Sequence, residues 1–357
     1  MSWREALRGR EREIAGKRLT VGFDGFADTI VRPLRQPDAP GVPAAPFATI
    51  REFGEFLTSK AEKSCSVELS VEARQLGGNL PFLSRAAGGL GLDVTCIGML
   101  GERGSIDPLF AQMPCRLHSF APPGQSTCME FNDGKLLFSS DCIVPGDAWD
   151  AVCTAVKDDV PTMFQEADLI ALVNWSELSF AHGLWEHVCD AVAEGPADKR
   201  KFAFFDLCDV SRRTDSELEA VLRLIGRFAQ SRTAVLSLNE NEALAVSERL
   251  LGGPDDPSEI AAAVCRHFGI DEVIVHTIHE SVLSSARGTI RRPSDFVAHP
   301  RISTGAGDNF NGASCLAAVM GLDDNDRLAF ANAFANFYIS QGRSPSMAEL
   351  MAASSDG

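Results

Sequence analysis

Short apolar runs recur along the second half of the chain and alternate with stretches of helical periodicity. These runs predict strands over residues 169–173, 202–205, 234–238 and 273–275. Two earlier strands are predicted over 19–23 and 94–97, with a helical stretch after Gly77-Gly78 that runs to about Ala87. Such alternation is typical of right-handed βαβ units, which build a parallel sheet covered by helices. We therefore expect an α/β fold with a doubly wound, mostly parallel sheet and helices on both faces.

Two segments interrupt this alternation, and we expect them to leave the core and form a small β lid. Residues 32–46 contain five prolines, which exclude a helix or a central strand, and apolar spacing predicts an amphipathic helix over 50–61. A β-hairpin is predicted over 126–139, because two β-prone segments flank Asn132-Asp133-Gly134. The predicted core comprises residues 16–31, 75–110 and 145–357, and the predicted lid excursions comprise 32–74 and 111–144.

The charge composition narrows the range of partners. The chain has 33 basic and 49 acidic residues, a net charge of −16, and no concentrated basic run. Nucleic acid and anionic membrane are therefore poor partners. No segment reads as a membrane span, and the ten cysteines are scattered without a CxxC pair, as expected for reduced thiols. A cytoplasmic enzyme is the simplest interpretation.

The candidate chemistry is concentrated in Ser303-Thr304-Gly305-Ala306-Gly307-Asp308-Asn309-Phe310. A loop with two glycines leads into a helix whose first turn carries Asp308, and the N–H groups at a helix start attract anions. The amides of Ala306, Gly307 and Asp308 could thus hold a phosphoryl group while the Asp308 carboxylate takes a proton from an acceptor hydroxyl. Taken alone, the same residues also fit a plain helix entry capped by Asp308.

The stretch from Thr304 to Phe310 resembles the C-terminal signature of the ribokinase-like superfamily, the PfkB-type carbohydrate kinases. The similarity extends from about Thr20 to the C-terminus and is patchy in the middle. It implies an ATP- and Mg²⁺-dependent kinase acting on a hydroxyl of a small sugar or related polyol, with Asp308 as base and Gly305 to Asp308 as anion hole. Thr304 is then a nucleotide contact, and a monovalent cation is a further candidate cofactor. Lids of this type can pair edge to edge, which would give a homodimer.

Polar residues just past the predicted strands are candidates for binding the acceptor, because ligands of open parallel sheets lie beyond the carboxyl ends of the strands. The candidates named on this ground are Asp24, Asp28, Asn174 and Asp206, each of which could instead be a helix cap or turn residue. The resemblance selects Asp28 as the sugar-binding aspartate, with Asp24 as its competitor.

Gly77-Gly78-Asn79 resembles the Gly-Gly motif of the same kinases, which implies that Gly78 and Asn79 lie at the sugar. Those kinases usually carry an asparagine three residues further on, where this chain has Phe82. The acceptor pocket is therefore expected to be more apolar than in relatives, and Phe82 could stack on a base.

Asn239-Glu240-Asn241-Glu242 resembles the Asn-x-x-Glu element of these kinases. The resemblance implies that Asn239 lies at the phosphates and that Glu242 binds magnesium through water, a role suited to a hard oxygen ligand. Alternatively, or in addition, Asn239 caps a helix and Glu242 complements its dipole.

Two further nucleotide contacts follow from the resemblance, which assigns Thr277 to the nucleotide and Asn332 to the wall of the adenine pocket. Relatives usually have Thr-x-Gly-x-x-Gly where this chain has His276-Thr277-Ile278-His279-Glu280-Ser281. We expect the Ile278 and Ser281 side chains to crowd the base or ribose. His276 and His279 lack a third nearby metal ligand, so a structural role is the simpler reading for them.

Three alternatives remain open. A nucleoside kinase shares the expected fold, and a non-catalytic sugar- or nucleotide-binding pseudokinase would explain the altered segment 276–281. Against the pseudokinase stand the complete Gly305 to Asp308 loop and the Asn239 and Glu242 pair. A dinucleotide-dependent oxidoreductase is disfavoured, because Gly88-Gly89-Leu90-Gly91 ends a predicted helix instead of opening one.

Overall fold

The computed structural model describes residues 2–37, 39, 41–102, 105–140, 142–144, 146–157 and 159–352. Within them, a nine-stranded sheet has the order β13-β12-β11-β10-β9-β8-β1-β4-β5. All pairs from β5 to β11 are parallel, whereas β12 and β13 continue the sheet antiparallel. The strands are β1 (Arg18–Phe23), β4 (Asp93–Gly98), β5 (Arg116–Ser119), β8 (Leu169–Leu172), β9 (Phe202–Asp206), β10 (Thr233–Asn239), β11 (Glu272–His276), β12 (Glu280–Ser285) and β13 (Gly288–Pro293). The predicted α/β fold is confirmed.

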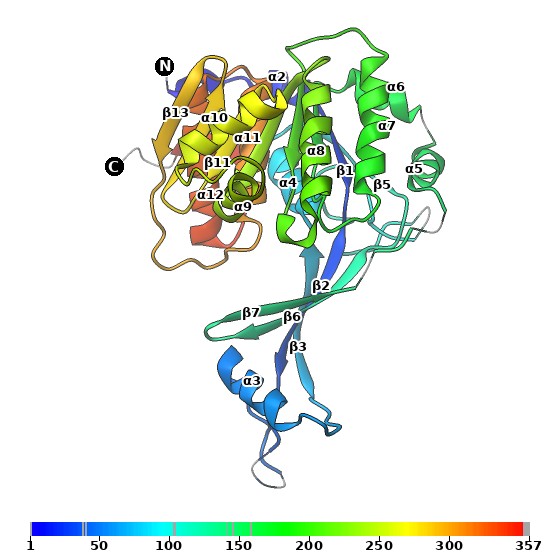
Figure 1. The fold of residues 1–357 in the computed structure, drawn as a ribbon, viewed down its shortest axis with the longest axis vertical. Coiled ribbons are helices and arrows are strands. Elements are labelled where there is room, and N and C mark those ends of the chain that lie inside the picture. The colour runs from blue at the N-terminus through cyan, green and yellow to red at the C-terminus, as the bar shows by residue number, and fades with distance from the viewer. Residues whose placement is uncertain are drawn as a thin grey trace.

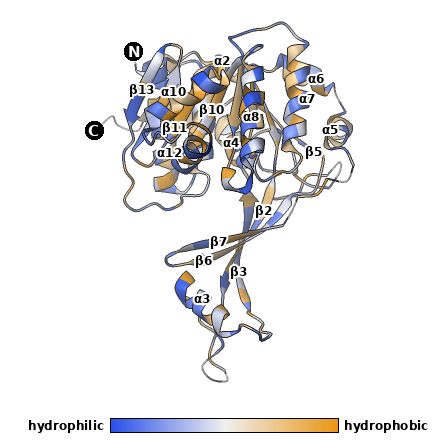
Figure 2. Cartoon of the chain, viewed as in Figure 1, coloured by the Kyte–Doolittle hydropathy of each residue, from blue (hydrophilic) through white to orange (hydrophobic). Residues whose placement is uncertain are grey.

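Helices cover both faces of this sheet, as Figure 1 shows. One face carries α5 (Ala148–Val156), α6 (Val160–Glu166), α7 (Ala181–Ala193), α8 (Asp215–Phe228), α9 (Glu240–Leu250) and α10 (Pro257–Phe268), with the short 3₁₀ helix η1 (Val210–Arg212) nearby. The other carries α1 (Trp3–Leu7), α2 (Glu11–Ala15), α4 (Asn79–Gly89), α11 (Ala306–Val319), α12 (Asp324–Gln341) and α13 (Met347–Ala352). The central strands are apolar on both sides because both sides are covered, and Figure 2 shows their hydrophobic colour inside the helical layers.

A second, four-stranded sheet projects from the main body (Figure 1). Its order is β3-β2-β6-β7, with β2 and β6 parallel and the outer pairs antiparallel. The elements are β2 (Phe26–Pro33), α3 (Ile50–Ser59), β3 (Leu69–Gly77), β6 (Gly124–Phe131) and β7 (Gly134–Ser139). We call this unit the lid. Its helix packs on the sheet through an aromatic cluster of Phe47, Phe53 and Phe131.

In the lid, the sequence predicted only part of the structure. The predicted hairpin and the predicted helix are present as β6, β7 and α3. The strands β2 and β3 were not predicted. Only two residues separate the end of β1 from the start of β2, which hides the boundary, and β3 is mostly exposed and lacks an apolar pattern.

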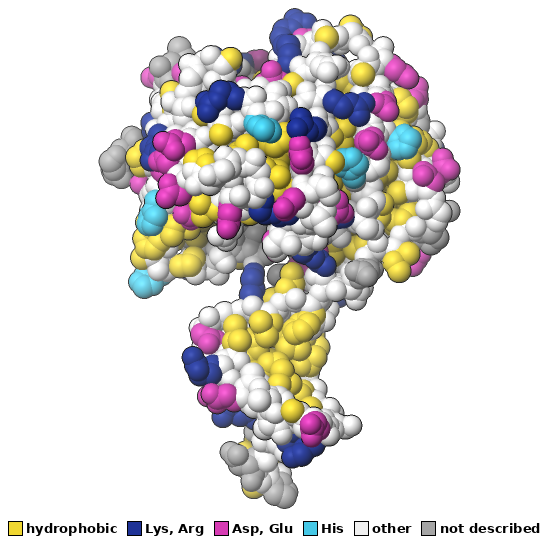
Figure 3. Space-filling view, in the orientation of Figure 1, with side chains coloured by type: hydrophobic (Ala, Val, Ile, Leu, Met, Phe, Trp, Pro, Cys, Tyr) yellow, Lys and Arg dark blue, Asp and Glu magenta, His cyan; other side chains and the backbone are white. Residues whose placement is uncertain are grey.

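The two edge strands of the lid carry exposed apolar side chains, namely Leu69 and Val71 on β3 and Leu137 and Phe138 on β7. Val71 is 66% exposed, and Figure 3 shows a continuous hydrophobic area on this part of the molecule.

Within the described residues, no helix combines the length and hydrophobicity that crossing a membrane requires. No disulfide joins any of the ten cysteines, all of which are described.

Candidate active site

Two aromatic side chains, Phe82 and Tyr338, pack against the glycine loop that precedes α11. Gly305 is the N-cap of α11 and has a left-handed backbone with φ of 81°. A Cβ at this position would lie 2.8 Å from Phe82 Cδ1 and 3.0 Å from Tyr338 Oη. The Tyr338 hydroxyl also donates to the Thr304 carbonyl, at 2.8 Å. Only glycine suits both the conformation and the available space.

The loop presents free backbone donors. The N–H of Ala306 is bound to the Ser303 carbonyl at 3.1 Å, so it is not available to a ligand in this geometry. The N–H groups of Gly307 and Asp308 have no acceptor among the described residues. These two amides, at the positive end of a fourteen-residue helix, are therefore free to bind an anion.

Asp308 belongs to a group of four acidic residues that the strand ends bring together: Asp24, Asp206, Glu242 and Asp308. Burial, followed by the charges of Asp206 and Asp24, raises the pKa of Asp308 well above its usual value, and a contact with the Asn79 amide counteracts this. Asp308 Oδ1 is buried without a hydrogen-bond partner. An unpaired buried carboxylate oxygen is costly, and such groups gather where proton transfer is needed.

Asp206 was considered at the sequence level but was not selected, and the structure places it at the centre of this acidic group. It ends β9 and accepts from Asn311 Nδ2 at 2.7 Å and from the Cys208 N–H at 2.9 Å. Asn79 Nδ2 lies 3.4 Å from its Oδ1. Burial raises the pKa of Asp206 to about 6.

Asp24 is fully enclosed and is used to hold the start of α4. Its carboxylate accepts from the N–H groups of Asn79 and Leu80, both at 2.8 Å, and from Asn174 Nδ2 at 2.7 Å. Burial nevertheless raises the pKa of Asp24 to about 7. Asn174 keeps a left-handed backbone, and its Oδ1 is buried without a partner. Asp24 thus has three donors already, whereas Asn174 offers an unused acceptor.

Asp28 lies on β2 of the lid and is more accessible. Ser126 Oγ donates to its Oδ1 at 2.5 Å, burial raises the pKa of Asp28, and Lys135 opposes that rise. A Cβ on Gly77 would lie 2.3 Å from Asp28 Oδ2. Lys135 itself extends from β7 and donates to Thr304 Oγ1, so a lid cation reaches the glycine loop. No sequence signal singled out Lys135, because a lysine after a hairpin turn is an ordinary surface residue.

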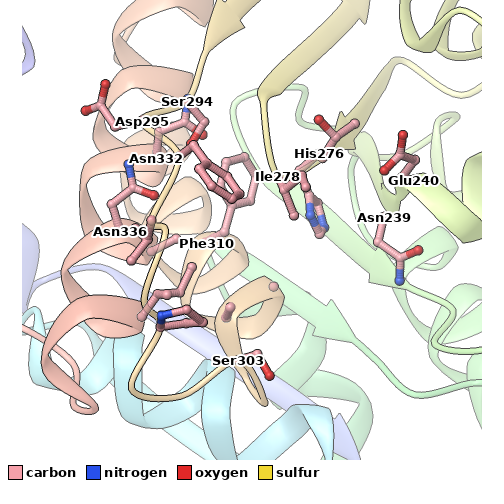
Figure 4. A pocket seen from close by; sticks show the side chains of 18 of the residues that line it. Asn239, Glu240, His276, Ile278, Ser294, Asp295, Ser303, Phe310, Asn332 and Asn336 are labelled. Carbon is pink, nitrogen blue, oxygen red and sulfur yellow. The ribbon is translucent and has the colours of Figure 1, made fainter. Parts of the chain in front are cut away.

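A cavity of about 460 Å³ adjoins the loop, and its lining includes Asn239, Thr277, Gly307 and Asn332. Figure 4 shows Asn332 and Asn336 at one end and His276, Asn239 and Glu240 at the other. The described lining contains no Lys or Arg. A cavity of this size, with the Asn332 and Asn336 amides at one end and Gly307 of the glycine loop in its lining, suits a nucleotide.

The predicted Asn-x-x-Glu element forms a complete helix cap. Asn239 is the N-cap of α9: its side chain accepts from the Glu242 N–H at 3.0 Å and donates to Glu242 Oε1 at 2.6 Å. Glu242 is 7% exposed, and burial with the charge of Asp206 raises its pKa well above the usual value. The capping interpretation is therefore confirmed. A magnesium role for Glu242 would have to be added to it.

The segment 276–281 forms a tight turn between β11 and β12, closed by the Thr277 N–H on the Glu280 carbonyl at 2.8 Å. Thr277 Oγ1 is occupied by the His279 and Glu280 N–H groups. Ile278 is 63% exposed and borders the cavity. Ser281 is fully buried opposite His276 and does not line the cavity, so the expectation that it crowds the base is wrong.

Phe82 lies beneath the glycine loop. Its side chain is 9% exposed and packs against Gly305 in the hydrophobic core. It supports the loop and is not part of the described lining of the 460 Å³ cavity, and its expected place at the acceptor stays a prediction. A comparison of sequences shows only that the asparagine is absent. It does not show the contact between Phe82 and Gly305, because these residues are more than two hundred positions apart in the chain.

Comparison with known proteins agrees with this geometry. The model of the family described as prokaryotic ketohexokinase matches residues 4–356. A ketohexokinase of Haloferax volcanii is 26% identical over 362 residues, covering 98% of this chain and 93% of that protein.

Solved structures share the fold at low identity. The ribokinase of Arabidopsis thaliana, solved with ribose and ATP, superimposes with a TM-score of 0.62 at 20% identity, over 95% of this chain and 99% of that one. Phosphofructokinase-2 of Escherichia coli, solved with substrates and products, has a TM-score of 0.62 at 14% identity, over 94% and 97%. These likenesses establish the architecture of a large sheet with helices on both faces and a smaller lid-like sheet.

Proposed function

Because the chain belongs to the prokaryotic ketohexokinase family and is an ATP-dependent carbohydrate kinase, we propose that it phosphorylates a hydroxyl of a ketohexose with Asp308 as the base. The observation that carries this assignment is the pairing, on one turn of α11, of two free N–H groups with a buried carboxylate oxygen that has no partner. Donors for a phosphoryl group and an acceptor for a proton are the two groups that this reaction needs from the protein.

In the proposed step, Asp308 accepts the proton of the acceptor hydroxyl while that oxygen forms a bond to the terminal phosphorus of ATP. The bond from this phosphorus to the bridging oxygen breaks, and ADP leaves with the electron pair. The Gly307 and Asp308 amides stabilise the charge on the transferring group. The raised pKa of Asp308 makes its carboxylate a stronger base than a solvent-exposed aspartate.

The acceptor would be held where the lid meets the core. Asp28 is the preferred hydroxyl acceptor, since Asp24 already binds three donors of the protein. Gly78 allows close approach of the chain, and the Asn79 amide and the free Asn174 Oδ1 supply further polar contacts. Thr304 and Lys135, joined across the interface of lid and core, would close over the phosphoryl group and exclude water.

The nucleotide would occupy the 460 Å³ cavity with its base towards Asn332. Magnesium is compatible with the residues present, because Asp24, Asp206, Glu242 and Asp308 gather beside the glycine loop and their carboxylates are suitable oxygen ligands. No group of three or more possible ligands is arranged for direct coordination within the described residues. Glu242, with Asp206, would therefore hold the ion through water, and the ion would neutralise phosphate charge. A monovalent cation is a further candidate, which rates with and without K⁺ would test.

The lid also suits self-association. Its edge strands β3 and β7 have unpaired hydrogen-bonding edges in the single chain and expose Val71 and Leu137. Edge strands of this kind are covered in stable proteins, and a second copy would cover them here. If light scattering gives the same monomer mass for the parent and for Val71→Asp, the dimer proposal fails.

A panel assay tests the function directly. ADP production is measured with ATP, Mg²⁺ and ketohexoses, aldohexoses, pentoses or nucleosides. We expect the highest kcat/KM with a ketohexose. A preference for a nucleoside would identify a nucleoside kinase of the same fold. ATP binding without turnover on any acceptor would instead support the non-catalytic alternative.

A further inference from the structure

His276 carries a polar side chain for which the fold provides no partner. It is the last residue of β11, where it lies beside Asn239 of β10 and opposite Ser281 of β12. Its ring packs against Phe310 with 5.0 Å between ring centroids. Neither ring nitrogen has a hydrogen bond to any described residue. The side chain is half-buried and lines a cavity, so its ring nitrogens are free to bind a ligand there.

The position of the ring identifies the kind of ligand. His276 borders the 460 Å³ cavity, and Figure 4 shows it on the wall between Ile278 and Asn239. A Cβ on Gly307 would lie 3.2 Å from His276 Cε1 and 3.8 Å from Nε2. The imidazole is therefore adjacent to the loop whose Gly307 and Asp308 amides are free.

We infer that His276 donates a hydrogen bond to the phosphate chain of the bound nucleotide and takes up a proton as the nucleotide binds. This inference rests on the proposed kinase function and adds a residue to it. The described cavity lining has no Lys or Arg, so a protonated imidazole would be the cation nearest to the phosphates on the nucleotide side. Lys135 reaches the same loop from the lid side.

The charges around His276 explain why its ring takes up a proton when the nucleotide binds. Burial lowers the pKa of His276 to about 4, so the ring is neutral in the empty enzyme at pH 7. The ionisable groups around it are Glu240 on α9 and Asp295, which line the same cavity, and Asp308, which follows Gly307 on α11. None of these groups contributes to the lowered pKa of His276, for which burial is the only cause. A bound polyphosphate adds several negative charges at the ring and favours the imidazolium.

NMR titration of protein labelled at its seven histidines tests the inference. The His276 signal, assigned by its loss in His276→Gln, is followed from pH 4 to 8 with and without Mg²⁺ and β,γ-methylene ATP. We expect its pKa to rise by at least one unit in the complex. Calorimetry in two buffers of different ionisation enthalpy should show proton uptake near pH 6 in the parent and less in His276→Gln.

The pH dependence of the nucleotide affinity shows whether the His276 side chain acts through its charge or only through packing. His276→Gln keeps an N–H donor but cannot titrate, so its affinity should match the parent within about threefold at pH 8 and fall by roughly tenfold at pH 6. The exposed His267 on α10 is the control, and His267→Gln should behave as the parent at both pH values.

Two results would overturn the inference. If the nucleotide analogue binds but leaves the His276 pKa unchanged, His276 does not contact the phosphates, and the kinase proposal stands. If the parent protein fails to bind the analogue at millimolar concentration, both proposals fail together.

Discussion

Asp24 Oδ2 lies 2.3 Å from the point that a Cβ on Gly78 would occupy. The glycine therefore makes room for a carboxylate that anchors the first turn of α4. Its neighbour Gly77 does the same for Asp28, so two consecutive glycines each face one aspartate. This explains physically why a Gly-Gly pair is required at this place.

Gly78→Ala should lower the free energy of unfolding and damage acceptor binding. The residue has φ of 91°, and the added methyl group would displace Asp24. Backbone strain of this type costs on the order of 1–3 kcal/mol. Gly89→Ala in the same helix is the matched control, because its Cβ would meet nothing within 4 Å. Denaturant unfolding curves that rank Gly89→Ala as the more damaging variant would refute this account.

Asp308→Asn should reduce kcat by roughly 10² to 10⁴ while nucleotide affinity survives, because the amide keeps the shape but cannot take the proton. Steady-state rates and calorimetric binding of the Mg²⁺-nucleotide complex provide the two readouts. A kcat within a few-fold of the parent would remove Asp308 from the role of base.

The acidic limb of the pH profile should report the environment of Asp308. Its carboxyl must be deprotonated to act, and its pKa is raised, so kcat/KM should rise with pH over a range well above that of an ordinary aspartate. The charge of Asp206 raises this pKa, and Asp206→Asn should therefore move the limb to lower pH. A limb that stays in place or moves to higher pH would contradict the coupling.

Asp28→Ala should raise the KM for the acceptor about 10- to 150-fold, because this is the loss of affinity expected when a hydrogen bond to a charged group is removed. The KM for ATP should stay nearly unchanged. Asp24→Ala should behave differently. It removes the acceptor for three donors and should mainly lower stability. Equal damage to both substrates by Asp28→Ala, or a selective effect on the acceptor from Asp24→Ala alone, would reverse the assignment.

Lys135→Met should lower kcat/KM by about tenfold or more, because it removes the lid cation that reaches Thr304. Lys135→Arg should retain part of the activity. Lys60, which lies over the Phe56 ring elsewhere in the lid, provides the control variant Lys60→Met. Equal rates for Lys135→Met and Lys60→Met would show that the contact has no role in turnover.

The sequence was sufficient for six strands of the large sheet, because buried parallel strands read as apolar runs: the predicted strand over 202–205 became β9, and β1, β4, β8, β10 and β11 matched as closely. The edge strands β5, β12 and β13 of the same sheet were not predicted, and β5 lies within the segment 111–144 that was predicted as a lid excursion. It was less informative for the lid. β3 exposes most of its residues and carries no periodic signal. Lid strands are defined by their pairing partners, which a local pattern does not contain.

The candidate site also combines residues that the sequence identified with residues that it did not. The motif around Asp308 was visible because its glycines and carboxylate are adjacent in the chain. Asp206, Lys135 and His276 were not selected, because each acquires its neighbours only through folding. The Ala306 amide shows the reverse, since the motif implies a free donor that a local turn occupies.

Phe82 and Tyr338, which support Gly305, are buried side chains of the folded core. The left-handed turn that aims the two amides is packed onto the same apolar layer that covers the large sheet. The donors are therefore already oriented when the chain has folded, and binding energy is not needed to arrange them. In the proposed mechanism, the folded interior of the protein therefore sets the direction of the phosphoryl donors before any substrate binds.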